Sequence, residues 1–166
     1  MSRRLIPFLV CTIILGLNGC SESSSPTDPG PIILPSFQTV FKATNTGVHE
    51  RRGEVILSQE RWEEVWSEIH AGQQTPGVPA PTIDFGTNML VMASMGDEPD
   101  GCWDIGITEV RAVVVRLEVA VAETRPPLSC TCPAVVVQPV HVVQVERADL
   151  PAQFRFVRSI LGVGCN

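Results

Sequence analysis

One segment of the chain has apolar residues at a helical period, and most other segments have a strand period. The helical stripe has the spacing i, i+3, i+4 and i+7: Trp62, Val65, Trp66 and Ile69. Ser58 precedes the stripe as an N-cap, and Gly72 stands where a helix would end. The pattern therefore predicts one amphipathic helix between these two residues.

Strand-like segments fill most of the remaining chain. The run 89–93 is continuously apolar, which is typical of a central strand covered on both faces. Further on, apolar residues alternate with polar ones, with a turn expected near Arg111, and Pro139 requires an edge position or a bulge. The expected strands are 37–44, 54–57, 89–93, 103–107, 113–121, 134–137 and 140–145. Because the connections are short, we predict an α+β fold: a mostly antiparallel β-sheet with one amphipathic helix packed on it.

The N-terminus resembles an export signal. Arg3 and Arg4 precede an uncharged apolar stretch, 5–17, that is too short to cross a membrane as a helix. The stretch ends in Leu-Asn-Gly-Cys20, which resembles the bacterial lipobox, where the cysteine is diacylated and becomes the new N-terminus. An ordinary signal peptide with a spare cysteine is the alternative.

These features divide the chain into three parts. We expect a lipoprotein signal peptide at 1–19, a lipidated Cys20 with a flexible Ser/Pro tether up to 36, and one domain at 37–166. The location would be the cell envelope, with the membrane contacted through the lipid. Ser21 favours the outer membrane where the host has one.

The charge balance argues against a nucleic-acid partner. Removing the signal segment takes away two of the 12 basic residues and none of the 18 acidic ones, which leaves a formal net charge of −8. Phosphate binding needs clustered basic side chains, and Lys42 is the single lysine among scattered arginines.

Four cysteines remain in the expected domain: Cys102, Cys130, Cys132 and Cys165. An even number in an exported chain indicates two disulfides. Cys130 and Cys132 are too close in sequence to bond each other easily, so each is expected to pair with Cys102 or Cys165, in either arrangement. Zinc binding and a redox-active thiol pair are alternatives, but the spacing fits neither well.

The loop before Cys102 is the candidate binding site. It comprises Gly96, Asp97, Glu98, Pro99, Asp100 and Gly101, and Trp103 follows it. A loop held by a disulfide is pre-organised for binding; a hairpin loop with solvated acids is the plain alternative. Calcium binding by Asp97, Asp100 and Asp104 is a further alternative, but these acids do not match the EF-hand spacing, and we expect no metal and no cofactor.

No pattern indicates catalysis. His49, His70 and His141 lie in different expected elements, and no nucleophile motif such as G-x-S-x-G is present. A Ser–His–Asp arrangement stays open, but we predict that the protein is not an enzyme.

The order of features over 40–145 resembles the C-terminal domain of the PrcB family. The shared features are the helix with Trp62-Glu63-Glu64-Val65-Trp66, then Ile83-Asp84-Phe85, the apolar strand, and the Gly96–Gly101 loop leading into Cys102-Trp103-Asp104. The family often has tyrosine where this chain has Cys102, and this chain contains no tyrosine.

The resemblance implies a lipoprotein subunit that stabilises or engages a secreted protease. The sequence is thus interpreted as a lipid-anchored, non-catalytic binding module. A protease-inhibitor-like domain and a structural envelope lipoprotein are the alternatives.

Overall fold

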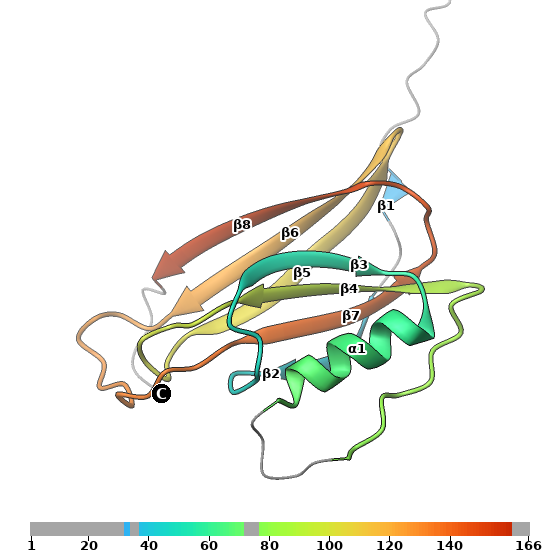
Figure 1. The fold of residues 1–166 in the computed structure, drawn as a ribbon. Coiled ribbons are helices and arrows are strands. Elements are labelled where there is room, and N and C mark those ends of the chain that lie inside the picture. Colours follow the sequence, from blue (N-terminus) through green and yellow to red (C-terminus); the bar gives the residue numbers. More distant parts are fainter. Residues whose placement is uncertain (1–31, 34–36, 72–76, 161–166) are drawn as a thin grey trace, which may run out of the picture.

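The computed structural model describes residues 32–33, 37–71 and 77–160. Within them the chain is mostly β-strand and contains a single short helix (Figure 1). The elements are β1 (Ile32–Ile33), β2 (Gln38–Ala43), β3 (Arg51–Ile56), α1 (Gln59–Ile69), β4 (Asn88–Met95), β5 (Asp104–Val113), β6 (Arg116–Arg125), β7 (Val140–Glu146) and β8 (Ala152–Ile160). This composition agrees with the α+β, mostly antiparallel prediction.

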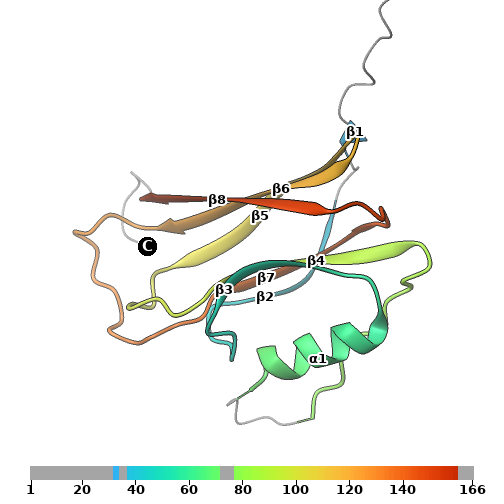
Figure 2. The ribbon, with the colours of Figure 1, turned by 45° about the horizontal axis from the view of Figure 1, so that its top comes forward.

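The strands form two sheets where the sequence pattern predicted one. The first sheet has the order β1-β5-β6-β8 and the second has the order β2-β7-β4-β3. All pairs are antiparallel except β6 with β8, which run parallel. Figure 2 shows the two sheets as stacked layers, with α1 on the far side of the second sheet. The architecture is therefore sheet, sheet, helix.

The main core lies between the two sheets. Every second residue of β4, β5, β6 and β7 points between the sheets, and these residues form one buried cluster. The cluster includes Met89, Val91, Ile105, Leu117, Val119, Val121, Val143 and Val145. Strands with one inward face alternate in polarity. The run 89–93 does not alternate, because β4 is an inner strand whose second face meets another core. The prediction of a central strand there is confirmed.

The second core lies between sheet β2-β7-β4-β3 and the helix. Trp62, Val65 and Ile69 of α1 are fully buried and share a cluster with Leu90 and Met92, among others. Ser58 caps the helix as predicted, because its side-chain oxygen accepts the N–H of Arg61 at 3.2 Å. The structure describes no residue at the predicted Gly72 stop, and the last helical residue is Ile69.

His141 of β7 connects the two sheets by a side-chain hydrogen bond. Its Nδ1 accepts the N–H of Ile107 at 2.8 Å, beside the register shift in β5 between Ile107 and Glu109. The proton of the neutral ring then sits on Nε2 and is donated to Thr39 Oγ1, 3.0 Å away. Burial lowers the pKa of His141 to about 4; Lys42 acts in the same direction and Asp104 against it.

The sheets also approach each other along β3 and β8. A Cβ on Gly53 of β3 would overlap the ring of Phe154 of β8, so the absence of a side chain lets the two strands pack closely. Phe154 in turn packs against the main core.

Several boundaries differ from those predicted. The turn expected near Arg111 lies at Val114 and Val115, so Val113 belongs to β5, and Val113 and Val115 do not share the buried face of β6. Strand β3 begins at Arg51, three residues before the expected start of the strand 54–57. The expected strand 134–137 is a loop that contributes one isolated bridge, from Val137 to Glu98. Strand β8 was not predicted.

Candidate binding surface

The Gly96–Gly101 loop joins β4 of one sheet to β5 of the other. Gly96 has a φ of +73°, in the left-handed region, and a Cβ there would approach the backbone of His49 and Arg51. The turn at this position therefore requires glycine. The loop lies at the end of the molecule where the segment after β6 also passes (Figure 1).

The three acids of this loop all have partners within the protein. Asp97 accepts hydrogen bonds from Gln138 Nε2 at 2.7 Å and from His49 Nδ1 at 2.8 Å, and both lower its pKa. Glu98 is buried and its carboxylate pairs with Arg158. Asp100 accepts the N–H of Cys102 at 3.1 Å. The loop is thus built into the fold, and differs from the solvated acidic turn that the sequence also allowed.

The segment between β6 and β7 is tied to this loop by its backbone and by a disulfide. Glu98 and Val137 exchange two backbone hydrogen bonds of 2.8 and 3.0 Å, and Gly101 N–H donates to Pro133 O at 2.9 Å. Cys102 and Cys132 form a disulfide with a Cα–Cα distance of 5.5 Å, and this pair is one of the two arrangements expected. We call these two joined segments, 96–102 and 126–139, the stapled end.

The second predicted disulfide lies partly outside the described residues. Cys130 is disulfide-bonded, but Cys165, its expected partner, lies outside the described residues, as does Cys20. The pairing of Cys130 with Cys165 and the lipidation of Cys20 stay predictions.

A network of arginines, carboxylates and aromatic rings lies next to the stapled end and contacts it through Glu98 and Trp103. The carboxylate of Glu123 is fully buried and receives Arg51 Nε at 2.7 Å and Arg158 Nε at 3.0 Å. Arg158 also lies over the ring of Trp103, 4.4 Å from its centroid, with Arg125 5.5 Å away. Trp103, predicted as a binding residue, is buried, and its ring packs against both guanidinium groups.

Apolar side chains are exposed on the outer segment of the stapled end. Leu128 is 74 % exposed, Val135 53 % and Val136 58 %. Sequence reasoning missed these residues, because Val135 and Val136 were assigned to a strand and Leu128 to no element. Val135 and Val136 are adjacent in the chain and Leu128 lies on the same loop segment, and grouped exposed apolar residues are a feature of interaction sites.

The three histidines serve separate local contacts. His49 pairs with Asp97, His70 packs on Trp66 with centroids 4.2 Å apart, and His141 bonds to Ile107. Within the described residues the one group with metal-ligand spacing is Asp100, Cys102 and Cys132, and its two sulfurs are joined in the disulfide. A disulfide sulfur lacks the thiolate that binds zinc.

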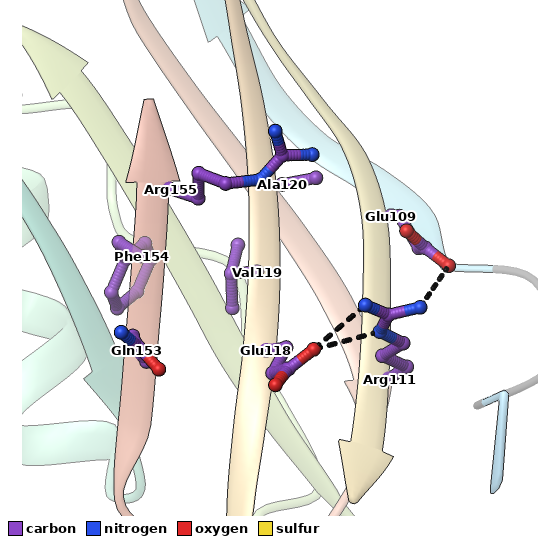
Figure 3. A pocket seen from close by; sticks show the side chains of 8 residues that line it. All are labelled: Glu109, Arg111, Glu118, Val119, Ala120, Gln153, Phe154 and Arg155. Carbon is purple, nitrogen blue, oxygen red and sulfur yellow. Dashed lines mark hydrogen bonds and ion pairs between the residues drawn. The ribbon is translucent and has the colours of Figure 1, made fainter. Parts of the chain in front are cut away.

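A second surface lies on the outer face of sheet β1-β5-β6-β8. It is an open hollow of about 300 Å³, shown in Figure 3. On one side Arg111 pairs with Glu118 at 2.8 Å and with Glu109 at 3.8 Å. On the other side Arg155 extends over Ala120, and among the described residues it has no ion pair. The charged lining consists of the carboxylates of Glu109 and Glu118 and the guanidinium groups of Arg111 and Arg155, so the hollow presents both signs of charge.

Comparison with known proteins found no similarity that adds to this picture. No family model matches the chain, and no curated protein or solved structure matches it either. The resemblance to the PrcB family accordingly stays a prediction. No helix in the described part of the chain is long and apolar enough to cross a membrane.

Proposed function

We propose that this chain is a lipid-anchored, non-catalytic binding module of the cell envelope, and that its stapled end engages a protein partner. The observation that carries the proposal is the set of exposed apolar side chains, Leu128, Val135 and Val136, on a segment held by a disulfide and backbone hydrogen bonds. The class of partner that the family resemblance implies is a secreted protease.

The energetics of the stapled end suit binding. Fully burying a valine or leucine side chain contributes about 1.5–3 kcal/mol, so three such residues can supply several kcal/mol to an interface. Binding loops normally lose conformational entropy when they become ordered. Here that cost is reduced, because the segment is already tied to the Gly96–Gly101 loop and to the network around Trp103.

Photocrosslinking in intact cells tests the proposal. A photoreactive amino acid at Leu128 should give a discrete protein adduct, and the same group at Val157, an exposed valine on the outer face of β8, should not. Mass spectrometry then identifies the adduct, and a secreted protease would support the expected partner class. Equal labelling from both positions, or no adduct from Leu128 in cells that retain the lipoprotein, would contradict the proposal.

A protease-inhibitor-like role is the second candidate. It is favoured by the position of Leu128, which is the most exposed large apolar residue among those described and lies between Pro127 and Cys130, themselves joined by a 2.9 Å backbone hydrogen bond. The purified protein should then lower the activity of at least one protease in a panel of secreted proteases, and Leu128→Asp should abolish that effect. Rapid cleavage after Leu128 without inhibition would exclude this role.

A further inference from the structure

The chain enters the domain beside the β5–β6 hairpin. Strand β1 pairs with the end of β5: Ile32 is opposite Ala112 and Ile33 is opposite Arg111. Strand β1 therefore lies next to the turn of that hairpin. Figures 1 and 2 both show β1 beside the hairpin tip, while the stapled end lies at the opposite end of β5 and β6. Because β5 has ten residues, the two ends are separated by about 33 Å.

The tip of this hairpin consists of two exposed valines. Val113 pairs with Arg116, so Val114 and Val115 form a two-residue turn, and they are 68 % and 65 % exposed. Two-residue hairpin turns favour Gly, Asn and Asp, and β-branched residues are poorly suited to them. Neither turn chemistry nor core packing explains valine at these positions, but contact with an apolar surface does.

The number of residues between Cys20 and β1 indicates which apolar surface lies within reach of the hairpin tip. Residues 21–31 separate Cys20 from β1, and an extended chain of this length spans at most about 40 Å. If Cys20 is lipidated, as the proposed function holds, β1 and the adjacent tip stay within this distance of the bilayer. A tethered group samples its target at a high effective concentration, so even a weak contact is formed much of the time.

We propose that Val114 and Val115 contact the lipid surface, and that the hairpin and the lipid on Cys20 together hold the domain with its stapled end away from the membrane. Stable peripheral attachment commonly uses two such signals. Arg116 follows the valines at the tip, and its guanidinium pairs with Glu118 at 2.6 Å, so this carboxylate is charge-compensated. The proposal rests on lipid anchoring and extends it to an orientation.

The test uses the full lipidated chain in vesicles of phosphatidylethanolamine and phosphatidylglycerol. A diazirine-bearing amino acid is placed at Val115, or at Val135 of the stapled end as the matched control of similar exposure. The expected result is lipid adducts at Val115 exceeding those at Val135 about tenfold, a ratio that corresponds to burial of one valine side chain. Equal adducts at both positions, or more at Val135, would overturn the orientation.

Three further measurements separate the possible failures. With the label at Val115, Val114→Asp should reduce the lipid adducts several-fold, whereas Val157→Asp should leave them unchanged. A cooperative urea-unfolding transition, followed by tryptophan fluorescence in each variant, shows that the domain is folded. Mass spectrometry of the mature N-terminus tests the anchor itself: an unmodified Cys20 overturns both the anchoring and the orientation, whereas a lipidated Cys20 with equal adducts overturns the orientation alone.

Discussion

Protonation of His141 should lower the stability of the domain in mildly acidic solution. In the folded protein its Nδ1 accepts the N–H of Ile107, and burial holds the pKa near 4, against the ordinary value of 6.5. Between these values the unfolded chain binds a proton that the folded chain does not bind. The free energy of unfolding therefore rises with pH across this window. The contribution of His141 is fully present above about pH 6.5 and is lost as the pH falls towards 4.

The size of the effect follows from the pKa difference. Each unit corresponds to 1.36 kcal/mol, so the difference of about 2.5 units makes this residue's contribution at pH 4 about 3 kcal/mol less favourable than at pH 7. This is a large share of the 5–15 kcal/mol that holds a typical domain folded. Protonation also replaces an acceptor by a donor that faces the Ile107 N–H, which accounts structurally for the loss.

Urea unfolding followed by tryptophan fluorescence at a series of pH values tests this reasoning. His141→Asn keeps an acceptor near the Ile107 N–H but cannot titrate, so it should be less stable than the wild type at pH 7 and should lose most of the pH dependence between 4 and 6.5. His49→Asn is the control, because His49 is largely exposed, and it should keep the wild-type slope. An unchanged slope in His141→Asn, or the same loss of slope in His49→Asn, would refute the assignment.

Three other sets of variants test the packing, the charge network and the disulfide by the same unfolding assay. Gly53→Ala should lower stability by about 1–3 kcal/mol through overlap with Phe154, and a second change, Phe154→Leu, should recover part of the loss; an additive double variant would contradict this. Arg158→Ala removes a partner of the buried Glu123 carboxylate and should cost about 3 kcal/mol, whereas Arg155→Ala on the same strand should change stability by less than about 0.5 kcal/mol; equal costs would refute the role of the network. Replacing both cysteines of the disulfide that closes a 30-residue separation by serine should cost about 3–4 kcal/mol, and an unchanged unfolding midpoint would show that backbone bonds alone hold the stapled end.

The helix and the inner strand could be predicted because their patterns are local. The helical spacing and the N-cap of Ser58 depend on neighbouring residues only, and the uninterrupted apolar run of β4 follows from its two covered faces. The division into two sheets could not be predicted, since both sheets produce the same alternation. The turn at Val114 was misplaced for the same reason: valine at a turn continues the strand pattern.

The candidate surface was predictable only in part. The cysteine spacing correctly indicated a link that includes Cys132, and the loop before Cys102 does form one side of the stapled end. The partners of its acids could not be foreseen, because Arg158 and Gln138 are distant in sequence and reach the loop only through tertiary structure. Exposure of Leu128 likewise depends on how the loop folds back.

The parallel pairing of β6 with β8 has a consequence for folding kinetics. After β6 the chain crosses to the other sheet, forms β7 there, and returns to the first sheet as β8. The pairing of β8 with β6 therefore closes a loop that contains all of β7. Folds dominated by such non-local pairing form in milliseconds to seconds, far more slowly than helical bundles. While β8 is undocked, the edge of β6 is open to proteolysis and to pairing with other copies, so the docking of this last strand ends the period of greatest vulnerability.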